Sequence, residues 1–157
     1  MGAAKVELRE GDPAPDFELE TDAGQRLRLS ALRGQTVVLY FYPKAGTPGC
    51  TVEACEFRDA MGRSKPDRVV VLGVSPDTPA ALARFKAQHR LPFTLLADPD
   101  KRAAQAYGVW TEKTLYGRKV MGIERTTFVV GPDGRIQRVY RKVRPQGHAA
   151  AVLAALD

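Results

Sequence analysis

Two long runs of β-branched and aromatic residues constrain the fold of this chain more than any other feature. Thr36–Tyr42 reads TVVLYFY, Val69–Ser75 reads VVVLGVS, and a shorter run covers Phe93–Ala97. Runs without polar alternation are typical of strands buried on both faces. The intervening stretches, Pro48 to about Met61 and Pro79 to about His89, have helical character. Strands that alternate with helices predict parallel pairing with right-handed crossovers.

Antiparallel hairpins are predicted on either side of this unit. Asp16–Leu19 and Arg26–Leu29 flank one turn, and Arg125–Val130 and Arg135–Tyr140 flank Gly-Pro-Asp-Gly. In that second turn proline presets φ and glycine permits a positive φ. The remaining segments are expected to be a short turn capped by Ser30 over 30–34, a helix over 101–107, a variable loop over 111–122 and a terminal helix over 146–156.

The whole pattern predicts one domain over residues 1–157 of the α/β class. We expect a mixed central sheet with helices on both faces and an N-terminal hairpin. This arrangement is compatible with a thioredoxin-like fold, but the pattern alone does not choose it over other α/β folds.

Composition excludes several other classes of protein. Hydrophobic residues make up 44% of the 157 residues and charged residues 27%, which suits an ordinary folded core. No apolar run is long enough to span a membrane, and the N-terminus has no apolar stretch typical of a secretory signal, so we expect a cytoplasmic protein. The net charge is +6, but the basic residues of the last strand alternate with apolar ones. They are expected to be a solvated face rather than a nucleic-acid site.

Cys50 ends a loop that joins a buried strand to a helix, and catalytic groups of open α/β sheets gather at such strand ends. Thr47 fits the N-cap position and Pro48 the first helical position, which places Cys50 in the first turn. Unpaired backbone N–H groups and the helix dipole there favour the thiolate, which is the nucleophilic form. The alternative is that Cys50 is an inert buried cysteine.

Cys55 lies about one and a half helical turns beyond Cys50, so the two Cα atoms would be roughly 8 to 9 Å apart. A disulfide requires less than about 7 Å, so a bond between these cysteines requires the start of the helix to unwind. The spacing differs from the Cys-x-x-Cys of thioredoxin-type exchange. His89 and His148 show no spacing that suggests a shared zinc site.

The segment Pro43-x-x-x-Thr47-x-x-Cys50 resembles the active-site signature of peroxiredoxins. The longer string Tyr42–Asp59 resembles the bacterioferritin-comigratory, or Q, branch of that family. Other segments similar to the family are GDPAPDF at 11–17, VSPD at 74–77, FTLLAD at 93–98, YGVW at 107–110 and RTTF at 125–128. The resemblance runs from about residue 5 to the C-terminus, and it implies a thioredoxin-like fold.

The resemblance implies a role for each residue that matches the family pattern. Cys50 would attack the peroxide and become a sulfenic acid. Thr47 would bind the peroxide or the thiolate, and Pro43 would shield the sulfur from water. Arg125 would hold the thiolate charged and stabilise charge as the O–O bond breaks. The supporting residues would be Glu53, which would orient the arginine, and Gly49.

The resemblance also implies how the enzyme is recycled. Cys55 would resolve the sulfenic acid as a disulfide, which thioredoxin or a similar dithiol would reduce. It implies no cofactor and no metal, and a monomer that acts on hydroperoxides without nucleic acid or membrane. Two alternatives remain: a thiol-disulfide reductase or redox-responsive interaction module without peroxidase turnover, and a binding module whose cysteines are incidental.

Overall fold

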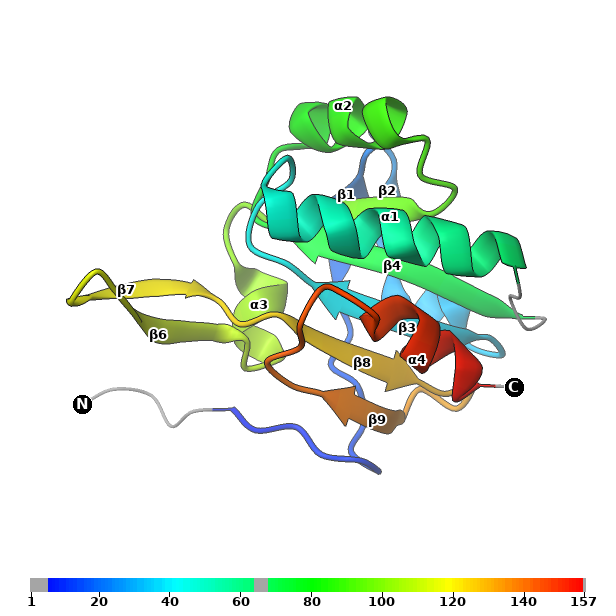
Figure 1. The fold of residues 1–157 in the computed structure, drawn as a ribbon. Helices are drawn as coiled ribbons and strands as arrows, with labels where there is room; N and C mark the ends of the chain where they lie inside the picture. Colours follow the sequence, from blue (N-terminus) through cyan, green and yellow to red (C-terminus); the bar gives the residue numbers. More distant parts are fainter. Residues whose placement is uncertain (1–5, 64–67, 157) are drawn as a thin grey trace.

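A computed structural model describes residues 6–63 and 68–156. Within these residues the chain forms one seven-stranded sheet with the strand order β2-β1-β5-β4-β3-β8-β9, and a separate two-stranded sheet of β6 and β7 (Figure 1). The strands are β1 Glu18–Thr21, β2 Arg26–Arg28, β3 Thr36–Phe41, β4 Val69–Ser75, β5 Thr94–Ala97, β6 Trp110–Leu115, β7 Arg118–Ile123, β8 Thr126–Val130 and β9 Ile136–Tyr140.

The strands β3, β4 and β5 pair in parallel, as the sequence predicts. Strand β1 joins β5 antiparallel, and β8 joins the other side of β3 antiparallel, so the large sheet is mixed. Strand β3 therefore has a partner on each side, and Val38 and Leu39 within it are 0% exposed. The apolar and aromatic composition of residues 37–41 follows from their burial on both faces of the sheet.

Helices cover both faces of the large sheet. The helices are α1 Pro48–Arg63, α2 Pro79–His89, α3 Arg102–Ala106 and α4 His148–Ala154, with a short 3-10 helix, η1, over Leu29–Leu32. Side chains from α1, α2 and α4 share one core cluster, while α3 and η1 contribute to a second. The prediction of helices on both faces of the sheet is therefore confirmed.

None of the described helices is long and apolar enough to cross a membrane.

The stretch 111–122, which we expected to be a variable loop, is most of a β-hairpin, and that expectation is wrong. Strands β6 and β7 pair antiparallel from Trp110 opposite Ile123 to Leu115 opposite Arg118. The two turn residues, Tyr116 and Gly117, have φ angles of 52° and 77°. This conformation matches a tight hairpin turn, which keeps the strands in register. Figure 1 shows the hairpin projecting from the body of the molecule.

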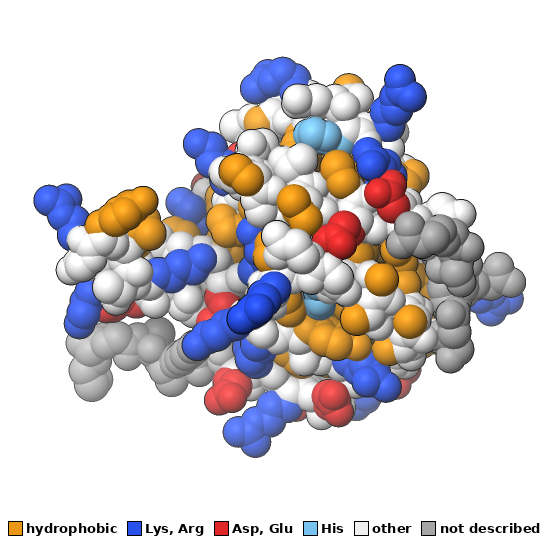
Figure 2. Space-filling view, viewed as in Figure 1, with side chains coloured by type: hydrophobic (Ala, Val, Ile, Leu, Met, Phe, Trp, Pro, Cys, Tyr) orange, Lys and Arg blue, Asp and Glu red, His pale blue; other side chains and the backbone are white. Residues whose placement is uncertain are grey.

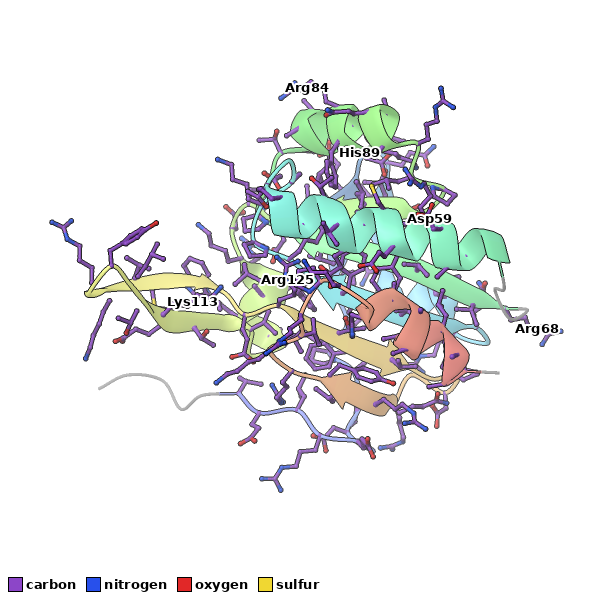
Figure 3. All side chains as sticks on the ribbon, viewed as in Figure 1. Asp59, Arg68, Arg84, His89, Lys113 and Arg125 are labelled. Carbon is purple, nitrogen blue, oxygen red and sulfur yellow. The ribbon has the colours of Figure 1, made fainter. Side chains whose placement is uncertain are left out.

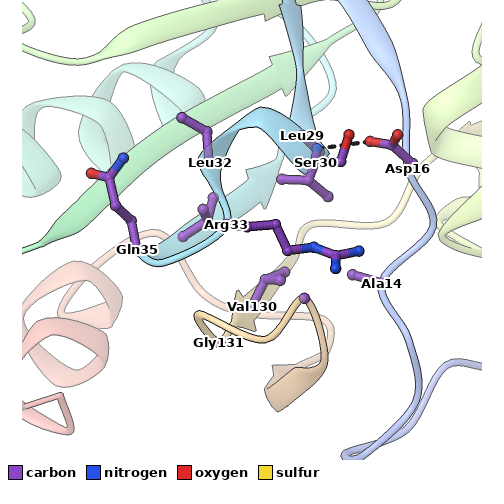
Figure 4. Close-up of a pocket in the computed structure, with 11 residues that line it drawn as sticks. Ala14, Asp16, Leu29, Ser30, Leu32, Arg33, Gln35, Val130 and Gly131 are labelled. Atoms are coloured by element: carbon purple, nitrogen blue, oxygen red, sulfur yellow. Dashed lines mark hydrogen bonds between the residues drawn. The ribbon is translucent and has the colours of Figure 1, made fainter.

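Ser30 does not cap a turn, contrary to our expectation, but lies inside the 3-10 helix η1. Its backbone N–H donates to Asp16 Oδ1 at 2.9 Å (Figure 4). Among the described residues, no side chain caps the start of η1, and Asp16, before β1, instead accepts from the serine backbone. Figure 4 also shows the small pocket around Leu29 and Arg33. It lies at the amino end of β3, the end opposite to Cys50.

Helix α4 packs against α1 through a buried histidine. His148 is 8% exposed, and its Nε2 atom lies 2.8 Å from the Thr127 hydroxyl on β8. Its ring contacts Phe57 of α1 and Tyr140 of β9 edge-on, with centroid distances of 6.1 and 5.5 Å. Burial lowers the pKa of His148 to about 4, with a contribution from Arg125, while Glu56 opposes the shift.

The buried histidine predicts a loss of stability in mild acid. The unfolded chain takes up a proton below about pH 6.5, whereas His148 in the folded chain stays neutral until about pH 4. The free energy of unfolding should therefore fall as the pH drops through this window, by at most about 1.4 kcal/mol per pH unit from this group. Urea denaturation at several pH values should show a shallower dependence for His148→Gln, and an identical dependence would contradict the assignment.

Candidate active site

The loop after β3 is fixed by hydrogen bonds to the end of β4. Asp77 Oδ2 accepts from the Ala45 backbone N–H at 2.8 Å and from the Ser75 hydroxyl at 2.7 Å. Gly46, in the same loop, has a φ of 86°, a conformation that favours glycine. The loop can therefore deliver the chain to the start of α1 in one conformation. Pro43 lies half-buried in this loop, directly after the buried Tyr42.

Thr47 occupies the residue before α1, as the sequence predicts for an N-cap. Its backbone carbonyl accepts from the Thr51 N–H at 2.9 Å, which is the first helical hydrogen bond. Its hydroxyl donates to the Lys44 carbonyl at 2.8 Å. The hydroxyl proton is thus donated within the loop, and the oxygen still has a lone pair that could accept a hydrogen bond.

Cys50 is the third residue of α1 and is 1% exposed. Its sulfur receives a hydrogen bond from Arg125 Nη2 at 3.3 Å. The arginine reaches the sulfur because Phe41, at the end of β3, pairs with Thr126 on β8, and this register places residue 125 beside the start of α1. Figure 3 shows Arg125 beneath the first turns of that helix. The guanidinium and the positive end of the helix dipole therefore both lie beside this sulfur.

Glu53 holds Arg125 from the opposite side. It lies three residues after Cys50, so both side chains share one face of the helix. Arg125 Nη1 donates to Glu53 Oε1 at 2.6 Å, and the Glu53 side chain is 0% exposed. Burial raises the pKa of Glu53 to about 7, against the attraction of the Arg125 guanidinium. The ion pair fixes the orientation of a guanidinium whose other nitrogen faces the sulfur.

Gly49 leaves the space that Arg125 occupies. A Cβ atom on residue 49 would lie 3.3 Å from Arg125 Nη2 and 3.5 Å from Pro145 Cγ. The first of these contacts is tighter than ordinary van der Waals packing allows for a fixed guanidinium. A side chain here would therefore press on the arginine–sulfur contact. The structure thus brings Gly49, Cys50, Glu53 and Arg125 into one cluster.

Cys55 lies in the same continuous helix as Cys50, and both cysteines are free. Cys55 is half-buried, whereas Cys50 is buried. Because Pro48–Arg63 is helical throughout, the structure holds the two cysteines in the arrangement for which helix geometry forbids a disulfide.

A cleft of mixed charge opens beside Arg125. It runs along the base of the β6–β7 hairpin and is lined by Thr111, Glu112, Lys113, Glu124, Arg125, Lys142 and Val143. Lys113, labelled with Arg125 in Figure 3, donates from Nζ to the Ile123 carbonyl. Burial lowers the pKa of Lys113, and the charge of Arg125 adds to this effect. Basic side chains outnumber acidic ones over the face shown in Figure 2.

Sequence reasoning missed the residues that support the cluster from outside α1. Asp77 fixes the loop, Lys113 lines the cleft, and the stretch that includes Pro145 and Gly147 packs against α1. Asp77 carried a signal, since it belongs to the VSPD segment quoted for the family resemblance. The other contacts depend on the hairpin and on the path from β9 to α4, which no local pattern specifies.

A free cysteine at a helix start, beside the carboxyl end of a buried strand and in contact with an arginine, is the arrangement of a thiol-based redox enzyme. Comparison with known proteins identifies the family within this class of enzyme. A model of the AhpC/TSA family matches residues 10–139. Peroxiredoxin Bcp of Bacillus subtilis is 45% identical over 146 residues, which cover 93% of this chain and 93% of that protein.

Solved structures agree with the sequence relatives. A mutant of Xanthomonas campestris peroxiredoxin Q superposes with a TM-score of 0.87 at 38% identity and covers 98% of both chains. The bacterioferritin comigratory protein of the same organism, described for its alkyl peroxide reduction activity, gives a TM-score of 0.84 at 39% identity over 89% of both chains. The chain belongs to the peroxiredoxins, in the bacterioferritin-comigratory or Q branch, with the thioredoxin-like fold and thiol peroxidase activity of that family.

Proposed function

We propose that this enzyme reduces hydrogen peroxide and organic hydroperoxides through Cys50 and recycles that residue through Cys55. The observation that carries the proposal is the 3.3 Å contact between Arg125 Nη2 and Cys50 Sγ, in a guanidinium fixed by Glu53. Alkyl peroxide reduction is the activity named for the similar Xanthomonas campestris protein, which supports organic hydroperoxides as substrates.

In the first step the Cys50 thiolate attacks the terminal oxygen of the hydroperoxide. The S–O bond forms as the O–O bond breaks, and the electron pair leaves with the departing oxygen, which takes a proton to become water or an alcohol. The Arg125 guanidinium stabilises the charge that passes from sulfur to oxygen. The Thr47 hydroxyl oxygen accepts a hydrogen bond from the bound peroxide, and Pro43 limits the access of water to the sulfur.

In the second step the Cys55 thiol attacks the sulfenic sulfur of Cys50. The S–S bond forms, the S–O bond breaks, and the hydroxyl leaves as water with the proton of Cys55. The first turns of α1 must unwind for this step, because the helical positions of the two cysteines are too far apart. A dithiol reductant, for which we propose thioredoxin, then returns both cysteines to thiols.

The same proposal places the enzyme in the cytoplasm as a monomer. A reducing compartment such as the cytoplasm keeps cysteines as thiols between turnovers. The alternative is a reductase or redox-responsive module, which would exchange disulfides rapidly but react slowly with peroxide.

The decisive measurement is the intact mass of the reduced protein seconds after one equivalent of hydrogen peroxide is added. We expect a loss of two hydrogens, since a Cys50–Cys55 disulfide replaces two thiols. The matched variant Cys55→Ser should gain one oxygen, because its sulfenic acid has no partner. A wild-type protein that stays unmodified for many minutes would overturn the peroxidase proposal in favour of the reductase.

A further inference from the structure

The segment 143–148, which connects β9 to α4, contacts α1 on both sides of the Cys50–Cys55 stretch. Near the start of the helix, Pro145 Cγ lies 3.5 Å from the place of a Cβ on Gly49. Beyond Cys55, the Gly147 backbone N–H donates to Glu56 Oε1 at 3.0 Å and to Oε2 at 3.3 Å. The residues that must rearrange to form a disulfide therefore lie between two contacts with one segment.

The segment 143–148 is in turn attached to the large sheet. The Val143 N–H donates to the Arg125 carbonyl at 3.0 Å. At its other end, His148 contacts the Thr127 hydroxyl at 2.8 Å and is buried between α1 and β9. Because β8 pairs with β3, where residues 37–41 are buried, these attachments are to the core of the large sheet. Figure 1 shows the segment passing close to α1 before α4 begins.

We propose that Glu56 is a positioning residue that sets how fast Cys50 and Cys55 can meet, an inference that rests on the proposed peroxidase function. Its carboxylate fastens the helix just beyond Cys55 to the sheet-anchored segment 143–148. In this proposal the unwinding extends through Cys55 to its neighbour Glu56, so the hydrogen bond to Gly147 must stretch or break. The hydrogen bond between Glu56 and Gly147 therefore raises the barrier to disulfide formation, because it must be broken on the way.

The Glu56–Gly147 hydrogen bond affects which of two competing reactions consumes the Cys50 sulfenic acid. In one fate Cys55 displaces the hydroxyl as water and forms the disulfide. In the other fate a second hydroperoxide oxidises the sulfenic acid to a sulfinic acid and is itself reduced to water or an alcohol. A tighter Glu56–Gly147 contact lengthens the life of the sulfenic acid, and so favours overoxidation at high peroxide concentration.

The test compares wild type with Glu56→Gln, which keeps an uncharged acceptor, and Glu56→Ala, which has none. Rapid-quench samples after a peroxide pulse give the rates of sulfenic acid and disulfide formation by intact mass. We expect disulfide formation to be about two- to tenfold faster in Glu56→Ala, with Glu56→Gln between it and wild type. The rate of sulfenic acid formation should not change. The peroxide concentration that overoxidises half of the protein should rise in the same order.

Asp59→Asn is the matched control, since it removes a carboxylate from an exposed position one turn further along α1, beside Arg58. It should leave both rates as in wild type. Equal disulfide rates in all four proteins would overturn the role of Glu56 and leave the peroxidase intact. Absence of any mass change in the wild type would instead refute the peroxidase itself. A faster disulfide in Asp59→Asn as well would assign the effect to general helix stability and also overturn the inference.

Discussion

Replacing Cys50 by serine is expected to lower the rate of hydroperoxide consumption by at least about 10³-fold. A serine hydroxyl is not ionised near neutral pH, so the variant has no nucleophile at the helix start. The residue is buried and the change is nearly isosteric, so the fold should persist. Peroxide consumption, followed in stopped flow with excess dithiothreitol as reductant, measures the effect.

The control for Cys50→Ser is Cys55→Ser, which should consume the first equivalent of peroxide at the wild-type rate. The two variants remove the same atom type from the same helix, so a general effect on α1 would appear in both. Peroxide consumption that persists in Cys50→Ser and disappears in Cys55→Ser would exchange the two assigned roles.

Replacing Arg125 by methionine is expected to lower the rate of sulfenic acid formation by about 10²–10³-fold. The variant removes both the hydrogen bond to the Cys50 sulfur and the cation that stabilises the departing oxygen. It also leaves Glu53 buried without its partner, and a buried carboxyl in that position takes up a proton. Single-turnover mixing with hydrogen peroxide, read by intact mass, isolates this step from recycling.

Arg138→Met is the matched control for the arginine, because Arg138 lies on the exposed side of β9 in the same sheet. It should react at the wild-type rate. Thermal denaturation of both variants separates a loss of fold from a loss of rate. A folded Arg125→Met protein that reacts as fast as wild type would show that the helix N-terminus alone activates the thiol.

The central part of the fold could be predicted from the sequence because its signals are local. The β-branched and aromatic runs at Thr36–Phe41 and Val69–Ser75 indicate strands that are buried on both faces. The sequence Gly-Pro-Asp-Gly indicates the turn between the last two strands. The β6–β7 hairpin was missed because its exposed strands carry few apolar residues and show little alternation. Its turn depends on a tyrosine with positive φ, which propensity does not favour.

In the candidate site, too, some residues could be predicted from local sequence and others could not. The position of Cys50 in the first turn follows from the neighbouring Thr-Pro-Gly, and physical reasoning from the sequence placed it there. Arg125 came only from the family resemblance, because 75 residues separate it from the sulfur it contacts. Its approach depends on the register between β3 and β8, and a single sequence carries little information about such long-range pairing. The contact between Glu56 and Gly147 is of the same kind, with 91 residues between the partners.

The long separation between Cys50 and Arg125 has a consequence for the protein during its synthesis. The sulfur and the guanidinium meet only after β8 has paired with β3, and β8 is made long after α1. A nascent chain that contains Cys50 but not yet Arg125 lacks the guanidinium contact to the sulfur. The part that we propose for Arg125 in peroxide reduction therefore arises late, once the sheet has assembled. The growing chain does not carry the complete site while its apolar strands are still exposed.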